Sequence, residues 1–486
     1  MEKPNVYSHI LKSTIVFGGM QGFNVLIGLL RNKFVALFIG PAGMGLVALF
    51  TSTIKLLGDI TNLGLPVSAV RELSKAYEDT DRSVLERLVS VFRRWTLCTA
   101  LVGMVLCVVL SSFISQLAFS SSDYTWHIVL LSPAVAFATL AAGETALLKA
   151  TRKIHKLVKS SVYSLIASLV ITVPLYYFYG IRGVVPVLVL VALAQAAIVL
   201  FYSFREYPWR FRGMFCEGYR FVRLGIAFIA GGVIGSITEF AIRSSLSAMS
   251  DVETVGLYNA AYMILVTYAG TVFTSMETDY YPRLSAVRGE GSATSEAENR
   301  NLIVSRQLEM NLLLMGPIIS AIILLLPIAI PLLYNWEFLG VVGMTQIAAA
   351  GLLFKAFYMP LEYIPLSRGE ARVFLVQESC CVVLLIVCEI IGYLLHGLDG
   401  LGAGIVVAYA VESIGVYVFC RIHYAYRLSF PSVQHLLVHV LNLLLLGCVV
   451  WLSEVDSWCY WLLGLFLCAA SLLYSFSRIR RSLKGK

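Results

Sequence analysis

Residues 31–59, RNKFVALFIGPAGMGLVALFTSTIKLLGD, combine a long apolar stretch with ionisable side chains inside or beside it. Most of the stretch is apolar enough to lie in lipid, yet it also holds Arg31, Lys33, Lys55 and Asp59. A charge near the centre of a bilayer is costly and usually faces a water-filled or protein-lined cavity. The stretch therefore predicts membrane-spanning helices that carry charge toward an interior space.

The composition of the whole chain agrees with a membrane location. Of the 486 residues, 58% are hydrophobic and 14% are charged, whereas soluble domains carry about 25% charged residues. This excludes a single water-soluble globule and indicates a polytopic membrane protein. A net charge of +8 would suggest nucleic acid as a partner of a soluble protein. Here the basic residues lie mostly in short loops, so no nucleic-acid partner is expected.

Fourteen stretches have about the 20 apolar residues that a helix needs to cross the hydrocarbon core. They predict an all-α polytopic membrane protein without a separate extramembrane domain. The last two stretches form a predicted hairpin around SEVDSW. The fourteen predicted spans are 12–38, 43–66, 92–115, 124–148, 157–179, 183–203, 222–246, 255–280, 308–334, 341–365, 372–395, 401–422, 433–452 and 457–477.

Lysine and arginine predict the orientation, because cytoplasmic loops carry an excess of these residues. Placing both termini and every second loop on one side puts 31 of the 37 basic residues there. We therefore expect both termini to be cytoplasmic. The remaining six lie in spans, at their outer ends or, for Arg182, in a short outer loop. These six are Arg31, Lys33, Lys55, Arg182, Arg243 and Lys355.

Short matches at an offset of 211 residues indicate an internal repeat. GLVAL from Gly45 matches GLYNA from Gly256, and Arg31 falls one residue from Arg243 in this register. Transporters often consist of two related bundles with the substrate site between them. The matches predict six-helix bundles over 1–205 and 222–430, a basic amphipathic linker over 206–221, and a final hairpin with a basic tail over 431–486. The linker suits a helix on an anionic cytoplasmic membrane surface or a plain solvated connection.

The intramembrane cations have two interpretations. In the first, they line a central cavity between the bundles and bind an anionic headgroup, because arginine donates two parallel hydrogen bonds to phosphate while lysine acts as a point charge. These candidate substrate-binding residues are Arg31, Lys55, Arg243 and Lys355. In the second, the charges are neutralised within each helix, since Lys55 with Asp59 and Glu239 with Arg243 have i,i+4 spacing.

Carboxyl groups within the spans are candidates for coupling transport to H⁺ or Na⁺, because a carboxylate in apolar surroundings takes up a proton more readily. For each of them, structural pairing with a lysine or arginine is the simpler interpretation. The candidates are Asp59, Glu144, Glu239 and Glu412.

Motifs of enzymes and of ATP-driven pumps are absent from the sequence. There is no GxxxxGK[ST] motif, no CxxC pair among the ten cysteines, and no long outer loop with paired carboxylates or a Ser/His/Asp set. We therefore predict no catalytic residue, no metal site and no cofactor beyond a coupling ion. A membrane enzyme of glycosyl chemistry is disfavoured.

Two segments carry a family resemblance. LRNKFVALFIGPAGMGLVALF, followed by LGDITNLGLPVSAVRELSK, resembles the first two helices of O-antigen translocases, and ETVGLYNAAYMI at 253–264 is similar to the matching turn of their second bundle. These proteins belong to the polysaccharide-transporter branch of the multidrug/oligosaccharidyl-lipid/polysaccharide exporter superfamily. The resemblance implies alternating access in the bacterial inner membrane. It also implies a flippase that moves an undecaprenyl-diphosphate-linked oligosaccharide, such as an O-antigen unit of lipopolysaccharide, from the cytoplasmic to the outer leaflet. The lipid-linked oligosaccharide and a polysaccharide polymerase are then the expected partners.

The final hairpin departs from this pattern. Many relatives end without it, whereas lipid-linked peptidoglycan-precursor flippases carry it, so such a flippase remains an alternative. A multidrug exporter of the same superfamily is another, but it predicts acids and aromatics in the cavity rather than Arg31 and Lys355. A membrane scaffold without transport activity is the alternative of a different class.

Overall fold

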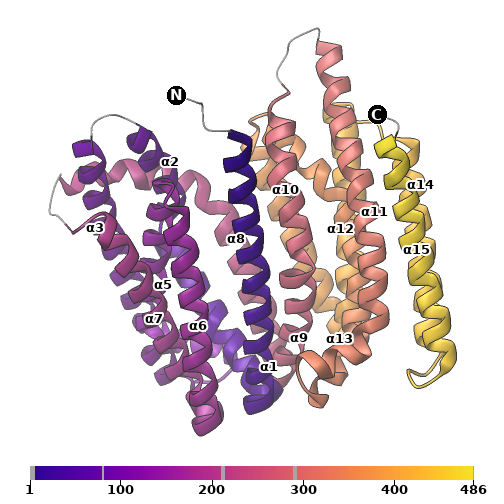
Figure 1. The fold of residues 1–486 in the computed structure, drawn as a ribbon. Helices are drawn as coiled ribbons and strands as arrows, with labels where there is room; N and C mark the ends of the chain where they lie inside the picture. The colour runs from indigo at the N-terminus through magenta and orange to yellow at the C-terminus, as the bar shows by residue number, and fades with distance from the viewer. Residues whose placement is uncertain (1–5, 79–81, 210–213, 288–292, 485–486) are drawn as a thin grey trace. The chain divides into compact units, whose positions relative to one another are not determined.

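The computed structural model describes residues 6–78, 82–209, 214–287 and 293–484, and its regular elements there are helices (Figure 1). The described part of the chain contains no strand. The chain divides into two compact units. Unit 1 is Met1–Gly256 with Leu333–Asn335, and unit 2 is Leu257–Leu332 with Trp336–Lys486. The expected all-α architecture is confirmed. Each unit is described by itself below.

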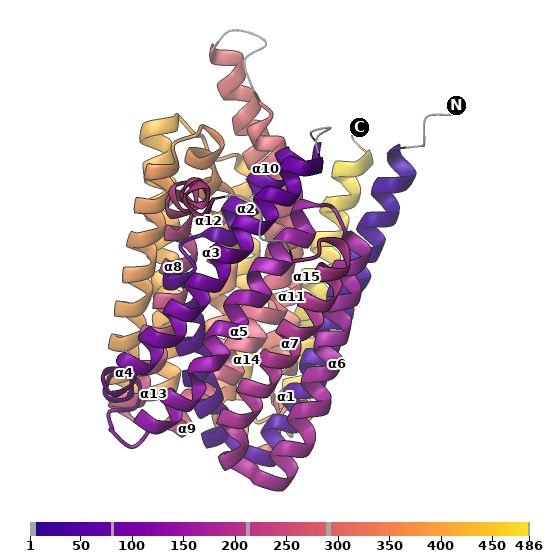
Figure 2. The same ribbon diagram turned by 90° about the vertical axis from the view of Figure 1, so that its left-hand side faces the viewer.

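Unit 1 is a bundle of long helices joined by short turns, which Figure 2 shows from the side (α1 to α8). Its elements are α1 (Val6–Thr61), α2 (Leu65–Glu78), α3 (Arg82–Val109), α4 (Ser111–Phe119), α5 (Thr125–Ala150), α6 (Ile154–Tyr179), η1 (Gly180–Gly183), α7 (Val184–Glu206), η2 (Phe215–Gly218), α8 (Tyr219–Met249) and the start of α9 (Val252–Tyr262).

Helix α1 contains the GPAGMGL turn, which breaks it into two arms. Gly40 has φ 62° and ψ −169°, a conformation that glycine adopts without a Cβ clash. Beyond the break, the backbone of the second arm comes very close to the start of α9. A Cβ on Gly45 would lie 1.9 Å from the Val252 carbonyl oxygen, and one on Gly256 would lie 1.9 Å from that of Pro41. The two glycines matched by the sequence repeat therefore permit one shared backbone crossing.

Helix α8 belongs to unit 1, where it packs against α1, α2 and α4. Phe221, near its start, is buried in a core with Phe92 of α3 and Leu147 of α5. The boundary between the units by packing thus falls near Gly256 rather than within the predicted linker. The two repeat-derived bundles, which rest on sequence matches, remain a prediction.

The described part of the predicted linker packs on α3. Phe215 stacks on Trp95 with ring centroids 4.6 Å apart, and the Trp95 indole N–H donates to the Phe215 carbonyl oxygen over 2.8 Å. Hydrogen bonds from the Arg87 guanidinium and the Met214 amide lower the pKa of Glu217. Residues 210–213 lie outside the described residues, and the membrane-surface and solvated interpretations of the linker both stay predictions.

Unit 2 comprises the rest of α9 and the helices that follow. A π-helical turn separates α9 from α10, so the predicted span 255–280 is interrupted. The elements are η3 (Met263–Tyr268), α10 (Gly270–Ser285), α11 (Ala293–Leu333), η4 (Trp336–Val341), α12 (Val342–Ser367), α13 (Ala371–Tyr424), α14 (Phe430–Leu452) and α15 (Trp458–Lys484). Helix α13 has two arms, because its backbone is non-helical at His396 and Gly397.

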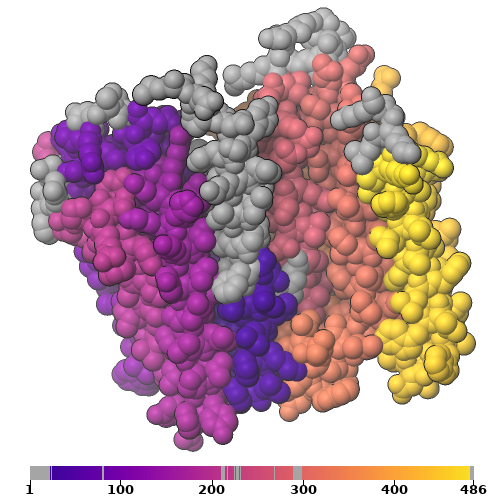
Figure 3. All heavy atoms as spheres, in the orientation of Figure 1, coloured from indigo at the N-terminus to yellow at the C-terminus, as the bar shows by residue number. Residues whose placement is uncertain are grey.

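The predicted final hairpin is present as α14 and α15, which lie along α11 within unit 2 (yellow in Figure 3). Polar side chains fix it there. Asn442 donates to the Ser320 hydroxyl over 3.0 Å, and the Tyr460 hydroxyl donates to the Leu324 carbonyl oxygen over 3.0 Å. Because the bilayer core offers no water, such buried polar groups need partners within the protein.

Ten helical ranges among the described residues are long and apolar enough to cross a membrane. Three of them, Val25–Thr61, Ile154–Glu206 and Ala371–Tyr424, each overlap two predicted spans. The predicted span 222–246 lies in α8, which is not one of the ten, and stays a prediction. The chain is a multi-pass membrane protein, and its many exposed Leu, Ile, Val and Phe side chains suit a surface that faces lipid.

Candidate functional site

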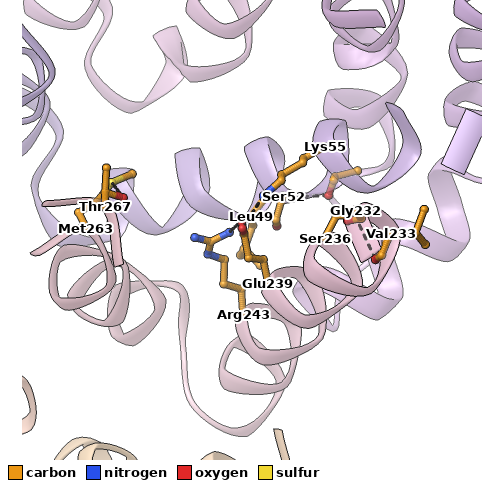
Figure 4. Close-up of polar contacts among 11 residues, drawn as sticks. Leu49, Ser52, Lys55, Gly232, Val233, Ser236, Glu239, Arg243, Met263 and Thr267 are labelled. Atoms are coloured by element: carbon orange, nitrogen blue, oxygen red, sulfur yellow. Dashed lines mark hydrogen bonds and ion pairs between the residues drawn. The ribbon is translucent and has the colours of Figure 1, made fainter. Parts of the chain in front are cut away.

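Two of the predicted substrate-binding cations share one carboxylate in unit 1. Lys55 on α1 places its Nζ 2.5 Å from Glu239 Oε1, and Arg243 Nη1 lies 3.1 Å from Glu239 Oε2. Figure 4 shows both side chains pointing toward Glu239 from α1 and α8. The Arg243 side chain is 5% exposed and that of Lys55 is 46% exposed. We call these three residues the basic triad; its two cations exceed its single acid by one charge.

The partner of Lys55 differs from the one that the i,i+4 spacing predicted. Its ion pair is made with Glu239 on another helix, while the Asp59 carboxyl lies beside Ser236, whose hydroxyl donates to the Gly232 carbonyl oxygen over 3.0 Å. The expected i,i+4 pair of Glu239 and Arg243 is present. Sequence spacing identifies partners within one helix only, so the bridge between α1 and α8 could not be found from it.

Arg31 lies on the first arm of α1, before the break at Gly40. Its guanidinium is partly buried, and Nη1 donates to the Ser168 hydroxyl on α6 over 3.4 Å. Arg31, Lys55 and Arg243 thus all belong to unit 1. Their common role in binding an anionic headgroup remains a prediction.

Glu144 is enclosed in a polar cluster in unit 1. The Arg93 guanidinium donates to both carboxylate oxygens over 2.8 and 3.1 Å, and the Ser203 hydroxyl donates over 2.5 Å. Arg93 also donates to the Tyr207 carbonyl oxygen over 2.6 Å. The two charged side chains are only 3% and 5% exposed. This geometry favours a structural role for Glu144, because its oxygens are already bonded.

Lys355 belongs to unit 2, on α12, and is surrounded by aromatic rings and acids. Its Nζ lies 5.8 Å from the centroid of the Phe273 ring and 5.7 Å from that of Tyr409, distances at which a ring face attracts a cation. The charged groups nearest to it include Glu362, Glu412 and Glu277. Lys355 therefore contributes one positive charge to a region with several carboxyl groups.

Glu412 and Glu362 are the centres of this acidic region. The Glu412 carboxyl lies beside the Cys381 thiol and the Tyr358 hydroxyl, and the Glu362 carboxyl lies beside that of Glu378. Glu378 was not a candidate by sequence, because it lies near the end of a span among polar residues. The pairing of two carboxyl groups became visible only when α12 and the first arm of α13 were placed together. The predicted ion-coupling role of Glu412 stays a prediction.

Comparisons with known proteins place the chain in a family. The model of the family described as "Polysaccharide biosynthesis protein" matches residues 10–287, more than half of the chain. The protein named lipid III flippase in Escherichia coli strain K12 is 24% identical over 373 residues, which cover 74% of this chain and 86% of that protein. A protein of the same name from Shigella flexneri matches equally.

Solved structures share the fold across most of the chain. A structure titled as the lipid II flippase MurJ in an inward closed conformation matches with a TM-score of 0.70 at 17% identity, covering 96% of this chain and 99% of that one. A multidrug resistance MATE family transporter of the MOP superfamily, in an inward-facing conformation, matches with a TM-score of 0.69 at 14% identity, covering 83% and 94%. At these identities the likeness shows the fold.

Proposed function

The chain belongs to the polysaccharide biosynthesis protein family within the multidrug/oligosaccharidyl-lipid/polysaccharide exporter superfamily, and on this basis we propose that it is a flippase for a lipid-linked oligosaccharide. Its substrate is an undecaprenyl-diphosphate-linked unit of a surface polysaccharide such as O-antigen. The unit moves from the cytoplasmic to the outer leaflet of the bacterial inner membrane by alternating access, and a polysaccharide polymerase uses it there. Both termini are cytoplasmic, and the chain itself catalyses no chemical reaction.

The observation that carries this proposal is the excess of positive charge in the basic triad. A diphosphate-sugar headgroup cannot cross hydrocarbon unaided, because its charged and hydroxyl groups would lose their hydration. Lys55 is half exposed and reaches Glu239 from α1, while Arg243 is nearly buried. An incoming diphosphate can bind Lys55 in place of Glu239, while Glu239 keeps its ion pair with Arg243. Arg31 and Lys355 are further contributors in this proposal.

The transport cycle is coupled to H⁺ or Na⁺ in our proposal. Asp59 supports this in unit 1, since its carboxyl lies near Ser236 and Lys55 but forms no ion pair among the described residues. Glu412 supports it in unit 2, since it lies beside Cys381 and Tyr358 and near Lys355. Glu239 is the third candidate through its bridge to the cations, and Glu144 is the least suited because Arg93 holds both of its oxygens.

A peptidoglycan-precursor lipid is the second candidate substrate. The observation in its favour is the final hairpin, α14 and α15, together with the match to a lipid II flippase over 96% of this chain. The match to the MATE transporter covers 83%. A multidrug exporter is the third candidate: the acids and aromatic rings around Lys355 in unit 2 favour it, whereas the excess positive charge of the basic triad does not.

The test is a headgroup-access assay in cells that lack this gene and carry plasmid-borne variants. We expect lipid-linked oligosaccharide to accumulate on the cytoplasmic leaflet, out of reach of an outer-leaflet enzyme. Lys55→Gln should fail to rescue at normal expression. Arg182→Gln, which removes an exposed cation in η1, is the matched control and should rescue fully.

Three results would count against different parts of the proposal. Absence of accumulation in the deleted cells would exclude a flippase for this lipid. Full rescue by Lys55→Gln would exclude the basic triad from headgroup binding while leaving the substrate class intact. Accumulation of a peptidoglycan precursor in place of the oligosaccharide would select the second substrate.

A further inference from the structure

A wedge-shaped cavity lies between the two arms of α13 in unit 2. At the arms' closed end the backbones touch: a Cβ on Gly404 would lie 2.3 Å from the Cys388 carbonyl oxygen, and one on Gly400 would lie 2.0 Å from that of Gly392. Toward the Arg372 and Tyr424 ends the arms separate and enclose a cavity of about 770 Å³. Glycines thus bring the two arms of α13 into backbone contact at one end, and the arms diverge toward the other end, which gives the cavity its wedge shape.

The depth of this cavity corresponds to one leaflet of a bilayer. On the first arm its lining runs from Arg372 to Leu384, which at 1.5 Å per helical residue spans about 18 Å. Half of a hydrocarbon core of about 30 Å is about 15 Å. The part beyond Gln377 is lined by Cys381, Leu384 and Val411, with Glu412 beside them, and Val411 is exposed. The cavity is therefore open to the lipid and long enough for an acyl chain.

The mouth of the cavity carries positive charge. Arg368, Arg372 and His423 line it together with one acid, Glu370. Glu370 already accepts a hydrogen bond from the Tyr424 hydroxyl over 2.6 Å and pairs with Arg368 over 3.3 Å. Arg372 takes part in none of the ion pairs formed among the described residues. An anionic group at the mouth would meet an arginine without a carboxylate partner.

A buried amide between the mouth and the apolar depth has no partner. Both the oxygen and the nitrogen of the Gln377 side chain are buried without a hydrogen bond in the part of the chain that the structure describes, and Gln377 lines the cavity. Burying such a group without a partner costs about 1–3 kcal/mol. Gln377 lies five residues below Arg372, or about 7.5 Å along the helix, where the glycerol esters of a lipid would follow its phosphate.

We propose that this cavity binds an anionic phospholipid of the leaflet that it faces, with its phosphate at Arg372 and Arg368, its ester groups at Gln377 and an acyl chain between the arms of α13. The distribution of lysine and arginine makes that leaflet the cytoplasmic one. Basic pockets between helices on that side of a membrane suit lipid headgroups of this charge. The bound lipid fills the wedge and holds the two arms at a fixed separation beside Glu412.

Native mass spectrometry of the purified full-length chain tests the proposal with phosphatidylglycerol as the probe. The deciding variant is Gly415→Leu. Gly415 lines the cavity and a Cβ there meets no atom within 4 Å, so a leucine side chain can start into the wedge without displacing the backbone. Gly447→Leu on α14 is the matched control, because its Cβ also meets nothing within 4 Å and it does not line the cavity. We expect Gly415→Leu to weaken binding at least fivefold and Gly447→Leu to leave it unchanged.

Charge selectivity is measured with phosphatidylcholine of the same acyl chains. The parent chain should bind phosphatidylglycerol at least fivefold more tightly, and Arg368→Gln/Arg372→Gln should reduce this ratio to about one. Arg421→Gln/Arg427→Gln is the control, since these arginines are exposed near the same end of α13 but do not line the cavity. Gln377→Leu should weaken the binding of both lipids.

Three results would overturn the proposal: equal binding of phosphatidylglycerol by Gly415→Leu and Gly447→Leu, equal binding of the two phospholipids by the parent, or displacement of phosphatidylglycerol by undecaprenyl phosphate at lower concentration. The third would make the cavity a site for the carrier lipid instead. Because these experiments measure phospholipid binding, a negative result would not contradict the proposed flippase function. Likewise, a chain without flippase activity could still be tested for phospholipid binding.

Discussion

Glu144→Leu is expected to destabilise the chain much more than its double variant with Arg93→Met. The Arg93 and Glu144 side chains are 3% and 5% exposed, so removing the acid leaves a buried guanidinium without its counter-charge. Breaking a buried pair in this way costs about 3–5 kcal/mol. Ser203 also loses its acceptor, but its hydroxyl can rotate, so we expect a total of about 4 kcal/mol.

The double variant Arg93→Met/Glu144→Leu removes both charges together. Apolar replacement of a buried ion pair is often neutral or stabilising, but here the Tyr207 carbonyl loses the Arg93 donor, which costs about 1–3 kcal/mol. We expect a net loss near 2 kcal/mol, which is about 2 kcal/mol less than the loss in Glu144→Leu alone. The measurement is unfolding of the purified protein in mixed micelles on titration with a denaturing detergent, followed by far-ultraviolet circular dichroism.

Two outcomes would refute this reasoning. A loss of less than 1 kcal/mol in Glu144→Leu would show that the charge is solvated in the membrane. A double variant as unstable as the single one would show that packing rather than charge dominates. Glu144→Gln distinguishes a structural role of Glu144 from a role in ion coupling. For a structural role, it should lower the stability of the protein while transport per folded molecule stays unchanged. Normal stability with lost transport would instead support ion coupling.

Two further predictions concern packing. Gly45→Ala should abolish the yield of folded protein, because its Cβ would lie 1.9 Å from the Val252 carbonyl oxygen. Gly28→Ala is the control and should fold normally, because a Cβ there meets nothing within 4 Å. Fluorescence-detected size exclusion measures both yields, and equal yields would contradict the backbone crossing. Asn442→Ala should lower the free energy of unfolding by about 0.6 kcal/mol, a value typical of hydrogen bonds between membrane helices, because its bond to Ser320 is lost. Detergent-induced unfolding measures this loss. An unchanged unfolding midpoint would contradict the contribution of this bond.

The architecture was largely predictable because every helix that crosses the hydrocarbon core needs about 20 apolar residues. Apolar length alone located the final hairpin and the two arms of α13, and the repeat located the glycines at 45 and 256 that meet at one crossing. Partners across helices were not predictable. Arg93 lies at the start of the predicted span 92–115 and was not among the candidate cations, and its pairing with Glu144, 51 residues away, depends on how α3 and α5 pack. The same applies to Lys55, whose partner lies 184 residues away.

Burial assigns different roles to the two cations that share Glu239. Arg243, at 5% exposure, has little freedom to leave the carboxylate, since a separated buried pair is costly. Lys55, at 46% exposure, has more freedom to leave Glu239 than Arg243 has. The exchange of Lys55 between Glu239 and an incoming anion is therefore the step at which headgroup binding can loosen the contact between α1 and α8. A buried intrahelical pair and a more exposed interhelical pair on one carboxylate allow the substrate to change helix packing without leaving a buried charge uncompensated.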